Sequence, residues 1–198
     1  MEKILVVFAA PTPIEKSHTA CLINRFLKHY TDLHHDVEVT WLDLNQEKDV
    51  NSQVLTYANK EAFFACSDKY INQLKSVDKV IVGTPMNNFN ISGLLKTYLD
   101  LIMVAKKTFE YKYDGYHKSV GLLTNLKVQI ICSQGAPVDW YPYSSFTTFL
   151  EGCFAFMGCK LNHSILMDGT KLAKYKGKTN NEIVDEYDGQ IKDAAKLF

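Results

Sequence analysis

An amide-rich segment between two apolar stretches is the part of the chain best suited to bind a ligand. The segment Pro85-Met86-Asn87-Asn88-Phe89-Asn90-Ile91-Ser92 follows the apolar run 79–84 and precedes a helical pattern that begins at Gly93. Its Asn side chains both donate and accept hydrogen bonds, whereas Met86 and Phe89 offer apolar surface. Asn is also common in solvated turns, but a solvated turn needs neither Met nor Phe. We therefore expect this segment to contact a flat ligand with a polar rim, and a flavin fits that description.

Two other loops carry groups that suit the same ligand. Ser17-His18-Thr19 stands at the start of a helical pattern, where backbone N–H groups and hydroxyls can hold a phosphate. Ser17 also fits an ordinary helix N-cap, and the residues alone leave both interpretations open. Ser133-Gln134-Gly135-Ala136 follows the apolar run 128–132, and Gly135 lets the backbone approach a ring closely.

The elements that position these loops alternate between strand and helix. Apolar runs rich in β-branched residues predict strands, and segments with helical spacing separate them. The predicted strands are 4–10, 37–44, 77–84, 128–132 and 161–167, and the predicted helices are 17–30, 57–75, 93–105, 146–157 and 181–198. This alternation predicts an α/β fold with a parallel sheet and helices on both faces. Five strands fit the doubly wound, flavodoxin-like order 2-1-3-4-5.

This strand order predicts that the three loops form one site. In a doubly wound sheet, ligands bind beyond the carboxyl ends of the strands, at the switch point between the first and third strands. The loops 9–19, 84–92 and 132–137 should meet there. The chain has no G-x-G-x-x-G and no G-x-x-x-x-G-K-[ST], so neither a Rossmann dinucleotide site nor a nucleoside triphosphate site is supported. These loops also lack a carboxylate pair and a nucleophile elbow, so we assign no catalytic side chain and expect a cofactor to carry the chemistry.

The composition excludes several classes of protein. A chain of 198 residues fits a single domain over 1–198. The 22 basic and 22 acidic side chains cancel, which argues against nucleic-acid binding. Five cysteines without a C-x-x-C pair, and six histidines that do not cluster with them, indicate reduced thiols and no metal site. Met1-Glu2-Lys3 leads directly into a strand, and the longest apolar run is too short to cross a membrane, so we expect a cytoplasmic protein.

The segment Pro85–Ser92 resembles the P-M-Y-N-F-N-I-S motif of the FMN-dependent NADH azoreductases, which also act as quinone reductases. The segments 95–100 and 108–111 are also similar to the family. In addition, Ser133-Gln134-Gly135-Ala136 resembles its S-R-G-G motif, and Ser17-His18-Thr19 resembles its S-Q-S motif. Together these marks span nearly the whole chain. Three positions depart from the family pattern. Ala10 stands where a Ser is frequent, Asn87 replaces Tyr, and Ala136 replaces the second Gly.

The resemblance implies a homodimer with one FMN per subunit at the interface. It also implies that FMN takes a hydride from NADH and passes two electrons, in a separate step, to a quinone or an azo compound, with nitroaromatics as further acceptors. Carried over by position, the residues that hold the phosphate are Ser17, His18 and Thr19, those that line the isoalloxazine are Met86, Asn87, Asn88 and Phe89, and those that meet the pyrimidine edge are Ser133, Gln134, Gly135 and Ala136. We further expect backbone N–H groups of 86–89 and 133–136 to support the anionic reduced flavin.

The aromatic and charged segment 108–119 lacks helical spacing and predicts either a short hairpin or a lid over a pocket. By the resemblance, 109–116 is a mobile lid in which Tyr111 and Tyr113 stack on the substrate. The alternative is an aromatic hairpin that packs on its own subunit.

Two other functions compete with the enzyme. One is a flavodoxin-like electron carrier that binds FMN without turning over a small substrate, and the other is an α/β interaction domain without a cofactor. Carriers usually dock through an acidic face, whereas this chain is neutral, and the insertion 109–116 has the character of a pocket wall. The loop Lys171–Lys178 fits either a contact with the 2′-phosphate of NADPH or a solvated basic surface.

Overall fold

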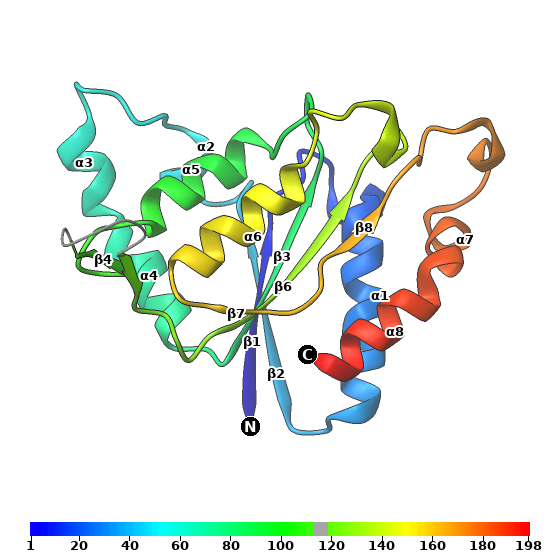
Figure 1. Ribbon diagram of the computed structural model, residues 1–198, viewed down its shortest axis with the longest axis horizontal. Coiled ribbons are helices and arrows are strands. Elements are labelled where there is room, and N and C mark those ends of the chain that lie inside the picture. The colour runs from blue at the N-terminus through cyan, green and yellow to red at the C-terminus, as the bar shows by residue number, and fades with distance from the viewer. Residues whose placement is uncertain (113–118) are drawn as a thin grey trace.

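The computed structural model describes residues 1–112 and 119–198 and shows a central parallel sheet (Figure 1). The strand order is β2-β1-β3-β6-β7, and β8 also pairs with β6. The strands of the sheet are β1 (Glu2–Phe8), β2 (Val37–Asp43), β3 (Lys79–Pro85), β6 (Lys127–Ser133), β7 (Lys160–Leu161) and β8 (Ile165–Met167). All neighbours pair in parallel. This confirms the flavodoxin-like class and the order 2-1-3-4-5, with β7 and β8 together in the fifth position.

The fifth strand differs from its prediction because it is split into β7 and β8. Between them, Asn162 Nδ2 donates to Gln129 Oε1 at 2.6 Å and to the Ala194 carbonyl at 2.9 Å. Gln129 Nε2 donates in turn to the carbonyls of Ile130 and His163, each at 2.9 Å. Buried side-chain amides therefore replace strand pairing at this point.

Helices cover both faces of the sheet, as predicted. One face carries α1 (His18–Leu33), α7 (Asn180–Val184) and α8 (Asp188–Leu197), and the other carries α4 (Ser67–Lys75), α5 (Gly93–Ile102) and α6 (Phe146–Phe156) (Figure 1). Alternate residues of β1 point to opposite faces. Ile4 and Val6 belong to the core beneath α1, whereas Leu5 and Val7 belong to the core beneath α5.

The predicted helix 57–75 is shorter and broken. It consists of α3 (Lys60–Ala65) and α4, which meet at Cys66, and Ala58 and Ala62 are exposed rather than on the inner stripe. Asn59 accounts for the late start, because its Oδ1 accepts from the Thr56 N–H at 2.7 Å and its Nδ2 donates to the Val54 carbonyl at 2.9 Å. These bonds favour a turn over a helix before residue 60.

One other helical expectation also needs correction. The predicted final helix 181–198 divides into α7, the 3-10 turn η4 (Asp185–Tyr187) and α8. In α6, Phe146, Leu150 and Phe154 are buried, whereas Phe149 is 43% exposed. The remaining short elements are η1 (Ile14–Lys16), α2 (Lys48–Asn51), η2 (Val138–Trp140) and η3 (Ala173–Tyr175).

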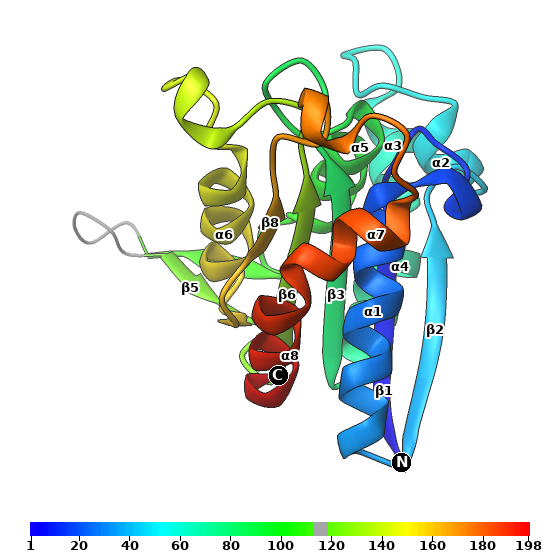
Figure 2. The ribbon, with the colours of Figure 1, turned by 90° about the vertical axis from the view of Figure 1, so that its right-hand side faces the viewer.

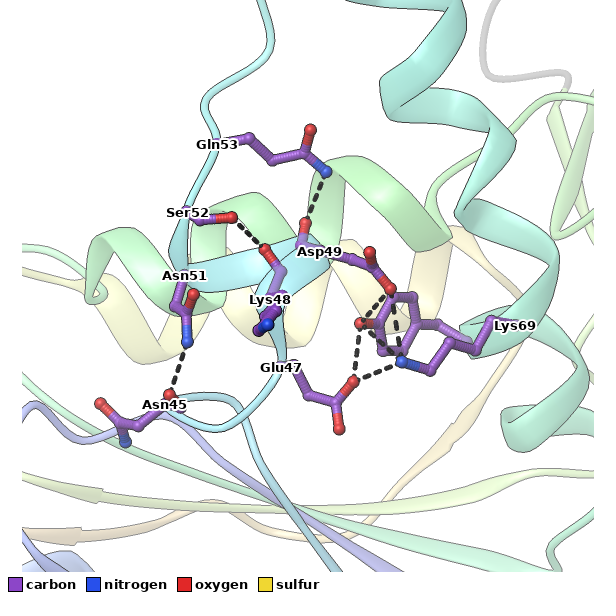
Figure 3. A network of polar contacts seen from close by, with 9 residues as sticks. Asn45, Glu47, Lys48, Asp49, Asn51, Ser52, Gln53 and Lys69 are labelled. Carbon is purple, nitrogen blue, oxygen red and sulfur yellow. Dashed lines mark hydrogen bonds and ion pairs between the residues drawn. The ribbon is translucent and has the colours of Figure 1, made fainter.

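The segment that follows β2 is fixed by a polar network at the carboxyl edge of the sheet (Figure 3). The carboxylates of Glu47 and Asp49 accept hydrogen bonds from Lys69 Nζ, at 2.5 and 3.3 Å, and from the Tyr70 hydroxyl, at 2.9 and 3.3 Å. Burial and the two carboxylates raise the pKa of Tyr70, so its hydroxyl stays protonated and donates. These bonds hold α2 against α4.

Of the two predictions for 108–119, the structure shows a hairpin. Strands β4 (Phe109–Tyr111) and β5 (Ser119–Gly121) pair antiparallel. Figure 2 shows the hairpin projecting from the side of the molecule, away from the loops at the carboxyl edge of the sheet. The Phe109 ring packs on Phe156 of α6 at 4.7 Å between ring centroids.

All five cysteines are free thiols, and Cys132, Cys153 and Cys159 are buried. Burial raises the pKa of the Cys159 thiol to about 12, which makes it a poor nucleophile. Among the described residues, no helix is both long and apolar enough to cross a membrane.

Candidate active site

The three loops expected to form one site lie side by side at the carboxyl edge of β1, β3 and β6. The Met86 N–H donates to the Ser133 carbonyl at 2.7 Å, which joins the second loop to the third. Thr19 Oγ1 and Ser133 Oγ share a buried hydrogen bond of 2.8 Å, which joins the first loop to the third. The switch point of the sheet therefore brings together residues that are far apart in the sequence.

A tight turn shapes the middle of the amide-rich segment. The Asn87 N–H donates to the Asn90 carbonyl at 2.7 Å, and the Asn90 N–H donates to the Asn87 carbonyl at 3.1 Å. Asn88 and Phe89 have φ of 47° and 68°, which is the geometry of a type I′ turn. Asn adopts this left-handed region readily, but for Phe it costs about 1–2 kcal/mol. The turn holds the Phe89 ring outward, 42% exposed.

Ser92 has a structural role at the end of the segment. Its hydroxyl donates to the Ala9 carbonyl at 2.7 Å and accepts from the Leu95 N–H at 3.2 Å. It therefore caps α5 and ties that helix to the end of β1.

A fourth segment, 168–173, completes the site. The N–H groups of Gly169, Thr170 and Lys171 donate to the carbonyls of Ala136, Gln134 and Gly135 at 3.1, 3.1 and 3.0 Å, respectively. Three consecutive N–H groups of this segment thus bond to three consecutive carbonyls of the third loop, and these bonds hold the loop and the segment together.

Between the second loop, the third loop and the segment 168–173 lies a cavity of about 540 Å³, and no residue of the first loop lines it. Its lining consists of Met86, Asn88, Phe89, Gly135, Ala136, Trp140, Lys171, Leu172 and Ala173. Five of the predicted ring-contact residues are in this set. Asn87 is exposed outside the lining, and Ser133 and Gln134 are buried behind it. Trp140 was not predicted to line the site. The loop Lys171–Lys178 was predicted either to contact the 2′-phosphate of NADPH or to be a solvated surface, and its position beside the third loop was not predicted.

Backbone N–H groups around this cavity are available to a ligand. In the described part of the chain, the N–H groups of Asn88, Phe89, Gly135 and Ala136 have no hydrogen-bond acceptor. Those of Met86, Asn87 and Gln134 are already used within the protein. The backbone N–H groups of 86–89 and 133–136 were expected to contact the reduced flavin. In the part of the chain that the structure describes, only those of Asn88, Phe89, Gly135 and Ala136 are free to do so.

Two aromatic side chains, Phe89 and Trp140, line the cavity, and two more pack against Phe89. The ring of Phe89 lies 5.1 Å from that of Tyr141 and 5.2 Å from that of Tyr143, both in edge-to-face contact. Tyr143 is 68% exposed and Trp140 is 60% exposed. Exposed aromatic rings at a cavity indicate a surface for planar ligands or for a partner.

At the start of α1, the structure shows Ser17 as an N-cap, and its contact with a phosphate stays a prediction. Ser17 Oγ accepts from the Ala20 N–H at 3.3 Å, so it is an N-cap. The N–H groups of His18 and Thr19 have no partner within the helix, as at any helix start. His18 Nδ1 is buried and without a hydrogen-bond partner among the described residues, and desolvation lowers the pKa of His18. The imidazole is therefore neutral and has a group free for a ligand.

Comparison with known proteins identifies the chain. The family model described as the flavodoxin-like fold matches residues 2–193. The chain is 41% identical to a protein of Mycoplasmopsis pulmonis over all of both chains. It is 45% identical to one of Malacoplasma penetrans, over all of this chain and 94% of that one. Both are named FMN-dependent NADH:quinone oxidoreductase. The chain belongs to this family.

A solved structure agrees with this family membership. The azoreductase of Bacillus anthracis str. Sterne superposes with a TM-score of 0.79 at 26% identity, over the full length of both chains. The resemblance to azoreductases and quinone reductases is thus confirmed. The family name does not assign individual residues, so the roles given to the loop residues stay predictions.

The described part of the expected lid, residues 109–112, does not line the cavity of its own chain. Tyr111 is 50% exposed, and its ring packs edge-to-face on Phe109 at 5.1 Å. Tyr111 is not among the residues that line the cavity. Tyr113 lies outside the described residues.

Glu186 anchors the chain that continues from the cavity wall. Its carboxylate accepts from Lys178 Nζ at 2.9 Å, from the Tyr175 hydroxyl at 2.8 Å and from Lys174 Nζ at 3.1 Å. These bonds lower the pKa of Glu186 from 4.5 to about 2. Since the folded pKa lies below the unfolded one, the stabilisation is complete above pH 4.5 and is lost as the pH falls through about 2.

We expect the free energy of unfolding of the Glu186→Gln variant to fall less at acidic pH than that of the wild type. Urea unfolding between pH 5 and pH 2 should show a smaller fall in the free energy of unfolding for the variant than for the wild type, because the variant has no proton to take up at this position. Glu38→Gln, at an exposed residue of β2 with no cation at ion-pair distance among the described residues, should follow the wild type. Equal slopes for Glu186→Gln and the wild type would contradict the anchoring role.

Proposed function

We propose that this chain is an FMN-dependent NADH:quinone oxidoreductase with azoreductase activity. The observation that carries the proposal is the partly apolar cavity beyond the carboxyl ends of β3 and β6, whose lining includes residues 88, 89, 135 and 136, the N–H groups of which have no acceptor among the described residues. Bound FMN supplies the redox chemistry there, accepting a hydride from NADH and then reducing a quinone or an azo compound by two electrons.

The residues that line the cavity fit a flavin ring. A volume of about 540 Å³ lies within the usual range for a cofactor site. Met86 and Phe89 provide apolar contact on one side, and Gly135 and Ala136 present backbone on the other. Gln134 Oε1 is buried without a hydrogen-bond partner among the described residues, which leaves an acceptor in the loop that meets the polar edge of the ring.

The start of α1 fits the phosphate. The N–H groups of His18 and Thr19 and the positive end of the helix dipole favour an anion there. Ser17 and Thr19 are almost fully buried and bonded within the protein, so their hydroxyls position the helix start more than they reach outward. Ala10 is buried and brings no hydroxyl to the site.

The aromatic rings at the cavity mouth fit planar acceptors. The rings of four residues offer faces for quinones, azo compounds and nitroaromatics: Phe89, Trp140, Tyr141 and Tyr143.

The same exposed rings support a homodimer, because large apolar side chains gathered on one surface are typical of an interface. In that dimer the hairpin with Tyr111 and Tyr113 is a lid for the partner's cavity, since Tyr111 does not line its own. The family match over residues 2–193 supports one domain over 1–198, and five free thiols favour the cytoplasm.

Anaerobic double-mixing stopped flow tests the proposed function. NADH alone should bleach the absorbance of protein-bound FMN, and a quinone added afterwards, with no further NADH, should restore it in one two-electron step. Reduction only in the presence of a separate reductase would make the protein an electron carrier instead. Failure of the purified protein to bind FMN under any reconstitution conditions would overturn the proposal.

A further inference from the structure

Lys171 is the one charged side chain among the residues that line the cavity. Its neighbours Lys174 and Lys178 form ion pairs with Glu186, but within 1–112 and 119–198 no carboxylate lies at ion-pair distance from Lys171. The third loop has no cation of its own, because residue 134 is Gln. The cavity therefore has a single positive charge that the described part of the protein does not neutralise.

The place of Lys171 is fixed by the loop that it covers. Its N–H donates to the Gly135 carbonyl at 3.0 Å. Its side-chain carbons Cδ, Cγ and Cε lie 3.0, 3.2 and 3.3 Å from the position that a Cβ on Gly135 would take. The aliphatic part of Lys171 thus lies across Gly135, and the absence of a side chain at residue 135 makes room for it. This directs the ammonium to the loop proposed to meet the pyrimidine edge of the flavin.

We propose that the Lys171 ammonium stabilises the reduced form of bound FMN and so raises the reduction potential of the enzyme. This inference rests on the proposed function. A hydride carries two electrons and one proton, so its transfer from NADH adds one negative charge to the ring. The ring loses that charge when two electrons and one proton leave it together for the acceptor. Lys171 is exposed, and a cation beside the ring favours the charged state of the ring over the neutral one through Coulomb attraction.

The variant Lys171→Met removes the charge of the side chain and keeps its packing on Gly135. Met keeps an unbranched apolar chain over Gly135 and removes the ammonium. The affinity for reduced FMN relative to oxidised FMN should fall about tenfold, which lowers the midpoint potential by about 30 mV for a two-electron couple. Lys171→Arg should stay close to the wild type. Lys176→Met, which removes an exposed lysine outside the cavity lining, is the matched control and should leave the potential unchanged.

The measurements are the midpoint potential of the bound flavin and the dissociation constant of oxidised FMN for each variant. An unchanged potential in Lys171→Met, with FMN bound, would overturn the role of Lys171 and leave the proposed function intact. An equal fall of the midpoint potential in Lys176→Met would also overturn the role of Lys171, because the shift would then reflect the net charge of the protein. A wild-type protein that binds no FMN would overturn the proposed function and this inference with it. If Lys171→Met does not fold, Lys171→Gln takes its place with the same expected shift.

Discussion

Replacement of Gly135 by valine should weaken FMN binding about 100-fold or more, a loss of about 2.7 kcal/mol, and leave the fold intact. Gly135 lines the cavity, and a Cβ there would lie 3.0 Å from Cδ of Lys171. A valine side chain must push Lys171 aside and occupy the space proposed for the ring. The backbone tolerates it, because φ of Gly135 is not in the left-handed region. The clash falls on the flexible end of a side chain, so the fold should lose little stability.

Titration of the FMN-free protein with FMN, followed by flavin fluorescence, measures this effect. Gly152→Val is the matched control, since a Cβ at that position in α6 meets nothing within 4 Å. The control should bind FMN as the wild type does. A dissociation constant for Gly135→Val within about threefold of the wild type, less than about 0.7 kcal/mol, would show that the ring lies elsewhere.

Gly121→Ala should cause the largest loss of stability, more than about 4 kcal/mol. A Cβ at residue 121 would lie 2.0 Å from the Gly158 nitrogen and 2.3 Å from the Met157 carbonyl carbon. Both are backbone atoms, so the end of β5 and the turn after α6 must separate. This movement strains the nearby hydrogen bond from the Leu123 N–H to the Met157 carbonyl, 2.8 Å long.

Chemical unfolding of wild type and variant gives the size of this loss. Gly189→Ala in α8 is the control, because its Cβ enters open space and alanine favours a helix over glycine by about 0.5–1 kcal/mol. The control should be as stable as the wild type or more so. A Gly121→Ala variant within about 1 kcal/mol of the wild type would contradict the close backbone contact at this position.

The fold was predictable where the hydrophobic pattern of a segment is sufficient to determine its secondary structure. The strands β1, β3 and β6 are apolar runs that are buried on both faces, and the alternation of strands with helices leaves few topologies. Local sequence patterns did not predict the ends and breaks of elements that depend on side-chain hydrogen bonds to residues elsewhere in the chain. The break of the fifth strand depends on bonds from Asn162 to Gln129 and Ala194, and no local pattern identifies those partners. The late start of α3 depends on the Asn59 side chain, which competes with helix formation.

The candidate site was predictable in its first three segments but not in its fourth. The loops after β1, β3 and β6 follow from strand order and residue type. Lys171 reaches the cavity only because 168–173 bonds along the third loop, and those are backbone bonds that carry no sequence signal. The left-handed conformation of Phe89 was also hidden, because phenylalanine rarely adopts it. Strain at such a residue is typical of a functional site.

A crystal structure of the protein with FMN tests the location of the flavin most directly. We predict that the ring lies between the 87–90 turn and residues 135–136, beside Lys171, with the phosphate at the start of α1. FMN seated instead in the groove of about 580 Å³ between α1 and α7, which Arg25 and Lys28 line, would contradict the assignment of the active site.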